Sequence, residues 1–88
     1  MNQKETTIIN ALGLHARPAA QLVKLASGFQ SEVELIRDGV PVNGKSIMGV
    51  MMLAAECGAK LTVRATGPDE DRAVEALVML VHQGFGEL

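Results

Sequence analysis

Hydrophobic residues follow two different spacings along the chain, and the spacing changes from one segment to the next. Between Ser31 and Arg37 the pattern has period two, with Val33 and Leu35 alternating with Glu32, Glu34 and Ile36, which is typical of a strand with one buried face. Between Ala16 and about Ser27 hydrophobic residues recur every three or four positions, which predicts a helix. The whole sequence predicts seven elements in the order β-α-β-β-α-β-α, with strands over 4–10, 31–37, 40–43 and 60–66 and helices over 16–27, 47–55 and 69–83.

Turn and cap residues mark where several of these elements begin and end. Asp38-Gly39 predicts a tight hairpin between the second and third strands. Pro41 has no N–H to donate to a strand ladder, so we expect the third strand at an edge of the sheet. Ser46 is a favourable N-cap for the second helix, and Gly28 stands where a helix C-cap glycine belongs.

Four half-buried strands and three helices predict an α+β fold. The strand positions between the apolar ones carry Glu, Thr, Lys and Arg, so one face of the sheet should meet water while the other meets the helices. We therefore expect an open-faced two-layer sandwich, in which a four-stranded antiparallel sheet carries three helices on one face. A chain of this length is expected to form a single domain over residues 1–88.

Composition narrows the classes of function. The chain has 88 residues, a net charge of −2, one cysteine and only two aromatic residues, Phe29 and Phe85. Its scattered basic residues and few aromatics argue against a nucleic-acid partner. No segment resembles a secretory signal or approaches the roughly 20 apolar residues that cross a bilayer, so no membrane partner is expected. With a single cysteine, which suits a reducing compartment, these features predict a cytoplasmic protein.

The segment Gly13–Pro18 is the first candidate for chemistry. His15 precedes a predicted helix, where the free N–H groups of Ala16 and Arg17 and the positive end of the helix dipole favour an anion. The Arg17 guanidinium matches phosphate oxygens, and a neutral imidazole is a nucleophile near pH 7. These features predict a site that forms and holds a phosphohistidine. They also suit an ordinary surface histidine with a solvated arginine, and the segment by itself leaves both interpretations open.

The segment after Ser46 is the second candidate. On a helix at 100° per residue, Val50 and Leu53 point one way and a second group of apolar residues points nearly the other way. That second group consists of Ile47, Met48 and Met51. If only one face meets the core, the other is an exposed, deformable patch suited to docking partners. The alternative is a short helix packed on both sides, with Ser46 acting only as its N-cap.

The other reactive residue types form no recognised site. Cys57 has no second cysteine at a metal or redox spacing, and we expect a buried or half-buried small residue there. His82 lies near the end of the last helix, where a cation is favourable, and is expected to act as a cap. No metal spacing and no cofactor motif occur, so neither a metal nor a cofactor is expected. A small hydrolase using His15 or Cys57 would lack a plausible triad.

Taken together, the two candidate segments resemble a known family. The motif HARPAA at residues 15–20, followed about thirty residues later by KSIMGVM at residues 45–51, is similar to the phosphocarrier protein HPr family of the bacterial phosphotransferase system. The resemblance covers essentially the whole chain, with the same order of elements. Residues 83–86 look more like the nitrogen-related branch of the family than the sugar-transport branch, and the choice between the branches stays open.

The resemblance implies a phosphocarrier and not an enzyme that turns over a free substrate. His15 would accept a phosphoryl group on Nδ1 from phospho-Enzyme I and pass it to an Enzyme IIA domain, with Arg17 steadying the phosphate or the partner. Ser46 would be the target of HPr kinase/phosphorylase. The implied docking surface around His15 consists of Ala20, Ile47, Met48 and Met51. We expect a monomer.

Two hypotheses from different classes remain at this point. The first is the phosphoryl carrier. The second is a regulatory protein-binding module of HPr type, which acts mainly through the Ser46/Met48 face in nitrogen or carbon regulation. Only the carrier would gain an acid-labile phosphate from phosphoenolpyruvate and Enzyme I.

Overall fold

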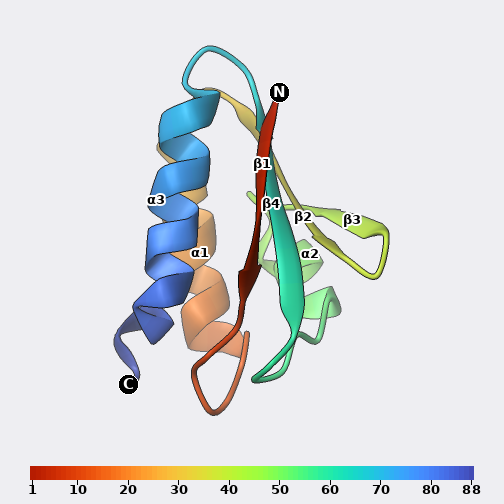
Figure 1. Ribbon diagram of the computed structural model, residues 1–88, viewed down its shortest axis with the longest axis vertical. Coiled ribbons are helices and arrows are strands. Elements are labelled where there is room, and N and C mark those ends of the chain that lie inside the picture. The colour runs from red at the N-terminus through yellow and green to blue at the C-terminus, as the bar shows by residue number, and fades with distance from the viewer.

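The computed structural model describes residues 1–88 and has the predicted order of elements. The sheet order is β1-β4-β2-β3, and every neighbouring pair is antiparallel. Helices α1 and α3 lie side by side against one face of the sheet, while α2 contacts α1 and the edge strand β3 (Figure 1). The α+β open-faced sandwich is therefore confirmed. The elements are β1 Asn2–Thr7, α1 Ala16–Ser27, β2 Glu32–Arg37, β3 Val40–Asn43, α2 Ile47–Met52, β4 Lys60–Thr66, α3 Glu70–His82 and a short 3₁₀ helix η1 Gly84–Gly86.

The core lies between the sheet and the two long helices. In β4 the residues Leu61, Val63 and Ala65 are buried, whereas the positions between them stay partly open to water. Helix α3 meets this layer with an apolar stripe that includes Leu77 and Val81, both fully buried. Full burial of one such leucine or valine side chain contributes roughly 1.5–3 kcal/mol relative to its exposure. The alternation predicted for β4 is confirmed, and it is what fixes the face on which the helices pack.

The hairpin between β2 and β3 has the predicted geometry. Asp38 and Gly39 both adopt positive φ angles, of 51° and 79°, and Arg37 pairs directly with Val40. Two successive positive φ angles match the right-handed twist of the strands on either side. Strand β3 lies at the edge of the sheet, as Pro41 requires.

The predicted limits of the first strand were wrong. Strand β1 covers Asn2–Thr7, whereas the sequence indicated residues 4–10. Its partner β4 begins at Lys60, which pairs with Thr7, so the ladder has no further partner strand after that residue. Beyond the strand, the N–H of Ile8 donates to the carbonyl of Ala59, and the chain turns Asn10 into the interior, where it is fully buried.

Helix α2 ends at Met52, three residues before the predicted end at residue 55. Ala54 adopts a positive φ of 48°, which stops the helix. The side chain of Arg37 compensates for the early end, because its Nη1 donates to the carbonyl oxygens of Leu53 at 3.1 Å and Ala54 at 2.8 Å. Carbonyls at a helix end have no partner within the helix. A residue from the neighbouring hairpin thus satisfies the carbonyls that follow this helix.

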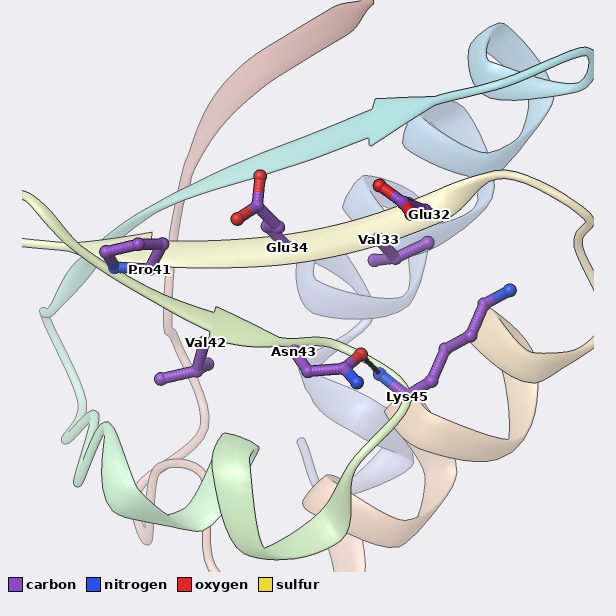
Figure 2. Close-up of a pocket in the computed structure, with 7 residues that line it drawn as sticks. All are labelled: Glu32, Val33, Glu34, Pro41, Val42, Asn43 and Lys45. Atoms are coloured by element: carbon purple, nitrogen blue, oxygen red, sulfur yellow. Dashed lines mark hydrogen bonds between the residues drawn. The ribbon is translucent and has the colours of Figure 1, made fainter.

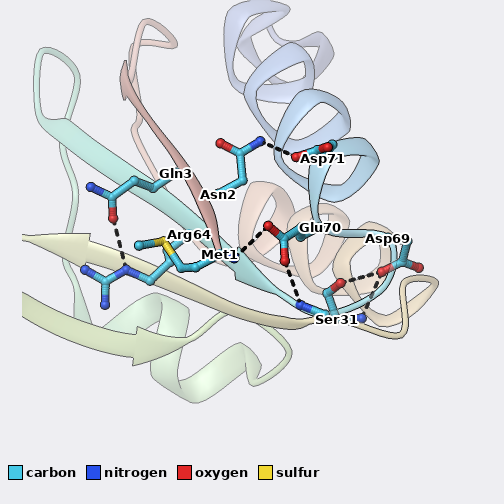
Figure 3. Close-up of polar contacts among 9 residues, drawn as sticks. Met1, Asn2, Gln3, Ser31, Arg64, Asp69, Glu70 and Asp71 are labelled. Carbon is cyan, nitrogen blue, oxygen red and sulfur yellow. Dashed lines mark hydrogen bonds and ion pairs between the residues drawn. The ribbon is translucent and has the colours of Figure 1, made fainter.

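Polar contacts join the start of α3 to distant parts of the chain (Figure 3). The carboxylate of Asp69 accepts hydrogen bonds from the backbone N–H groups of Gln30 and Ser31 and from the Ser31 hydroxyl. These bonds, led by the hydroxyl, lower the pKa of Asp69 to about 2. The carboxylate of Glu70 accepts from the Gly67 N–H and pairs with the Met1 amino group. Helix α3 spans Glu70–His82, within one residue of its predicted limits at each end.

No helix in the protein has the length and apolar character needed to span a bilayer.

Candidate functional site

His15 stands at the N-cap of α1, and the loop before it is held by the segment that follows α2. Gly13 has a φ of 65°, and a side chain there would collide with the carbonyl oxygen of Ala55. The next N–H, that of Leu14, donates to the same carbonyl at 2.8 Å. The carbonyl of His15 then accepts the first helical hydrogen bond, from Ala19 at 3.0 Å. The backbone at Gly13 therefore packs against Ala55 as only a glycine can, and this contact sets the position of His15 at the start of α1.

The start of α1 has free hydrogen-bond donors. The N–H groups of Ala16 and Arg17 have no acceptor within the protein, and Pro18 has no N–H to satisfy. The first turn contains no acidic residue, and Arg17 is exposed without an ion pair. Unpaired N–H groups, the helix dipole and a nearby guanidinium all stabilise an anion at this position.

The imidazole of His15 does not cap its own helix and instead contacts the end of the chain. Its Nε2 lies 2.8 Å from Oε2 and 3.1 Å from Oε1 of Glu87, a residue 72 positions away. The side chain of His15 is 36% exposed and that of Glu87 is 16% exposed. Figure 1 shows the C-terminus at the same end of the molecule as the loop between β1 and α1.

Glu87 is in turn held by Asn10, and sequence reasoning missed both residues. The Asn10 amide nitrogen Nδ2 donates to Glu87 Oε1 at 2.9 Å and to the Gly13 carbonyl at 2.8 Å. The hydrogen bond from Asn10 is the main cause that holds the pKa of Glu87 below its ordinary value, and hydrogen bonding to His15 and the charges of His15 and Arg17 act in the same direction. No spacing in the sequence links these residues, since only the fold brings them together.

Ser46 occupies the N-cap of α2, as predicted. Its Oγ accepts a hydrogen bond from the Gly49 N–H at 3.1 Å. The neighbouring Lys45 side chain extends to the carbonyl of Phe29, to which its Nζ donates at 2.7 Å. The hydroxyl of Ser46 is thus part of the local helix start, unlike the ring of His15.

One face of α2 is apolar and exposed. Val50 is fully buried beneath the helix, whereas the residues on the other face are 46%, 77% and 43% exposed. We call these three residues together with the exposed Ala20 of α1 the docking patch; they are Ile47, Met48, Met51 and Ala20. Because α1 and α2 contact each other, the members of the patch belong to neighbouring helices. The helix is therefore not packed on both sides.

The weaker candidates lie outside this region. Cys57 was expected to be buried or half-buried, and that prediction was wrong: the residue is exposed in the turn after α2, with its Sγ 3.7 Å from the Ile9 carbonyl. Cys57 stands between Glu56 and Gly58, and all three residues of this turn are exposed to water. His82 is exposed in the last turn of α3. No group of three or more His, Cys, Asp or Glu side chains is arranged to hold a metal ion.

A hollow of about 350 Å³ opens on the β2–β3 hairpin (Figure 2). Its lining includes Pro41 and the side chains of Glu34 and Lys45, and neither His15 nor any residue of the docking patch takes part. His15 lines none of the hollows in the surface, and its partly exposed ring is reached directly from the outside.

Comparison with known proteins gives consistent similarities over the full length. Residues 2–83 match the protein family described as PTS HPr component phosphorylation site. The chain is 54% identical to the phosphocarrier protein HPr of Cupriavidus necator, over 99% of this chain and 98% of that protein. It superimposes with a TM-score of 0.96 on HPr-C-His from Thermoanaerobacter tengcongensis, at 44% identity, covering 100% of this chain and 99% of the other. A structure described as an HPr dimer from the same organism matches with a TM-score of 0.79 at 45% identity, covering 99% and 100% of the two chains.

Proposed function

Because this chain belongs to the HPr family of phosphocarrier proteins, we propose that His15 is its phosphoryl acceptor and that the phosphoryl group passes from phospho-Enzyme I through His15 to an Enzyme IIA domain. One observation carries the proposal above the others. The imidazole of His15 is partly exposed at a helix start whose first N–H groups have no partner in the protein. A phosphoryl group on this ring would meet donors that are already in place.

The chemistry requires only a nucleophile and a stabilised anion. A lone pair of the His15 ring attacks phosphorus, the bond from phosphorus to the donor atom breaks, and its electron pair stays on the donor. The phosphoryl oxygens then lie near the free N–H groups of Ala16 and Arg17. The Arg17 guanidinium offsets part of the two negative charges that a phosphate brings.

Partner recognition is assigned to the docking patch. Its exposed apolar side chains lie on α2 and on the helix that begins at His15, so a partner that covers the patch also reaches the histidine. Methionine side chains adapt to different surfaces, which suits a protein that must bind a phosphoryl donor and an acceptor in turn. We assign this exchange to the cytoplasm and to the monomeric form of the protein.

Ser46 is proposed as a regulatory phosphorylation site for HPr kinase/phosphorylase. Its hydroxyl lies at the N-cap of α2, directly before Ile47 and Met48 of the patch. A phosphate there would be tolerated by the helix start yet would put up to two negative charges beside apolar side chains that a partner must bury.

The proposal is tested by incubating the protein with radiolabelled phosphoenolpyruvate and a catalytic amount of Enzyme I. We expect one acid-labile phosphate per chain, none in His15→Ala, and wild-type labelling in the matched control His82→Ala. His82 is the only other histidine and is exposed on α3. Labelling of His15→Ala to the wild-type level would reject His15 as the acceptor.

The exposed patch also supports a second candidate, in which the protein acts mainly as a regulatory binding module through its Ser46/Met48 face. The same assay separates the two functions. A folded wild-type protein that takes up no phosphate but binds partners in a manner lost in Met48→Glu would favour the regulatory module.

A further inference from the structure

The carboxylate of Glu87 contacts Nε2 of His15, whereas Nδ1 is the ring nitrogen proposed to accept the phosphoryl group. Its two oxygens lie 2.8 and 3.1 Å from Nε2, and no protein group bonds to Nδ1. Glu87 is largely shielded from water, with 16% of its side chain exposed. A histidine that donates one ring N–H to a carboxylate has its tautomer and orientation set by that bond.

The direction of each hydrogen bond in this group can be followed from the backbone outward. The Gly13 carbonyl can only accept, so it must face the amide nitrogen of Asn10. The second hydrogen of that nitrogen points to Glu87 Oε1, while Asn10 Oδ1 is buried without a partner. Reversing the Asn10 amide would set its oxygen against two acceptors. The backbone therefore fixes Asn10 as a donor and Glu87 as an acceptor.

An ionised carboxylate accepts hydrogen bonds and cannot donate them. The contacts that lower the pKa of Glu87, first of all the bond from Asn10, keep it ionised near neutral pH. The ring nitrogen that faces it must then carry the hydrogen. In a neutral imidazole the other nitrogen, Nδ1, is left with a free lone pair.

We propose that Glu87, held by Asn10, is a positioning residue that keeps the proton of His15 on Nε2 and so keeps Nδ1 as the nucleophile. The inference rests on the proposed function, in that phosphoryl transfer is the reaction it serves. As Nδ1 bonds to phosphorus and the donor leaves with its electron pair, the ring becomes positively charged with its proton still on Nε2. The negative Glu87 carboxylate stabilises that positive charge, and no ring proton has to move.

Glu87→Gln gives the sharpest test, because it should reverse the tautomer. The glutamine oxygen can still accept from Asn10, which places its NH₂ group against Nε2. An NH₂ group donates, so Nε2 must accept and the ring proton must move to Nδ1, the reacting atom. Glu87→Ala removes the partner without reversing the bond. The more conservative substitution should therefore be the more harmful one.

The experiment combines two measurements on wild type, Glu87→Gln, Glu87→Ala and the control Glu75→Gln, which alters an exposed carboxylate of α3 that forms no ion pair. Long-range ¹H–¹⁵N spectra in mildly alkaline buffer distinguish the protonated ring nitrogen of His15 from the bare one. The exposed His82 serves as an internal reference. Initial rates of phosphorylation by Enzyme I and phosphoenolpyruvate give kcat and KM for each protein as substrate.

In the wild type we expect the proton on Nε2, and in Glu87→Gln on Nδ1, with kcat lowered about tenfold and KM nearly unchanged because the docking patch is untouched. Glu87→Ala should lose less rate, and Glu75→Gln none. Wild-type ring signals and a wild-type kcat in Glu87→Gln would overturn the inference. So would a loss of rate that follows a lowered melting temperature while the ring signals stay unchanged. If the wild type itself accepts no phosphate, the proposed function fails, and the ring signals still decide whether Glu87 sets the tautomer.

Discussion

Two helices of this protein begin at residues proposed to carry phosphate, and their starts are built differently. Ser46 caps α2 with its own side chain, accepting the N–H of Gly49 three residues ahead. His15 occupies the same position in α1, yet its side chain makes no capping bond and contacts Glu87 instead. At Ser46 the side chain finds its hydrogen-bond partner within four residues, at Gly49. At His15 the side chain finds its partner only near the end of the chain, at Glu87.

The difference matches the chemistry proposed for each site. A hydroxyl that a kinase modifies needs only to be exposed at a tolerant position, and a local N-cap supplies that. A histidine that exchanges phosphate with protein partners needs a set ring orientation, a set tautomer and donors left free for the phosphate. Leaving the N–H groups of α1 unsatisfied costs some helix stability but retains the anion site.

The largest expected effect separates function from stability at the two helix starts. His15→Ala should lose all phosphorylation and change the free energy of unfolding by less than about 1 kcal/mol, because its bond to Glu87 is partly exposed. Ser46→Ala should lower the free energy of unfolding by about 1 kcal/mol through the lost cap and still acquire phosphate. Denaturant melts and labelling of the same samples check both. A large loss of stability in His15→Ala would contradict the comparison.

Arg17 should have the next largest effect, on transfer and not on stability, because it is exposed and unpaired. Arg17→Ala is expected to slow phosphoryl transfer in at least one direction by about tenfold, the value of one well-placed charged hydrogen bond. Arg17→Lys should recover part of the rate, because a lysine lacks the forked geometry that matches phosphate. Quenched time courses with purified phosphoryl donor and acceptor proteins give the transfer rates in each direction. Full recovery in the lysine variant would mean that charge alone is sufficient.

Ser46→Asp should slow phosphorylation of His15 several-fold while keeping the melting temperature. Aspartate is as good an N-cap as serine, so α2 should persist, but its charge must be desolvated when a partner covers the docking patch. Gln3→Glu is the matched control, since it adds the same charge on the open face of the sheet, beside Arg64. Equal rates of His15 phosphorylation in Ser46→Asp and the wild type would show that the partner does not cover the docking patch.

The smallest effect concerns the third helix start, where Asp69 also turns away from its own helix. Its pKa of about 2 in the folded protein lies below the ordinary 3.8, so the unfolded chain binds more protons between these values. The stabilisation from Asp69 is fully present above about pH 4 and is lost as the pH falls towards 2. Asp69→Asn should therefore melt below wild type at pH 7, and the gap should narrow between pH 4 and 2. A gap independent of pH would show that the charge of Asp69 is not involved.

The periodic elements could be predicted from the sequence, and their boundaries only where a local signal exists. Helix α1 and strands β3 and β4 match their predicted ranges because alternation, Gly28 and the Asp38-Gly39 turn act over a few residues. Strand β1 and helix α2 were misplaced at their ends. The first stops where its partner strand stops, and the end of the second is completed by Arg37 of the hairpin, which binds the carbonyls of Leu53 and Ala54. Neither contact is local in the sequence.

The amino-acid sequence alone determined the order of the elements, the two phosphate-bearing candidates and the apolar face of α2, because period, caps and motif depend on residues within one or two helical turns. The tertiary structure decided what holds the ring of His15. Glu87 contacts both Asn10 and His15, which lie 77 and 72 positions before it in the sequence. Asn10 is fully buried, and the chain turns before Glu87 at Phe85, which is only 2% exposed. Hydrogen bonds act between atoms about 3 Å apart, and only packing of the chain ends against one core brings these atoms within that distance.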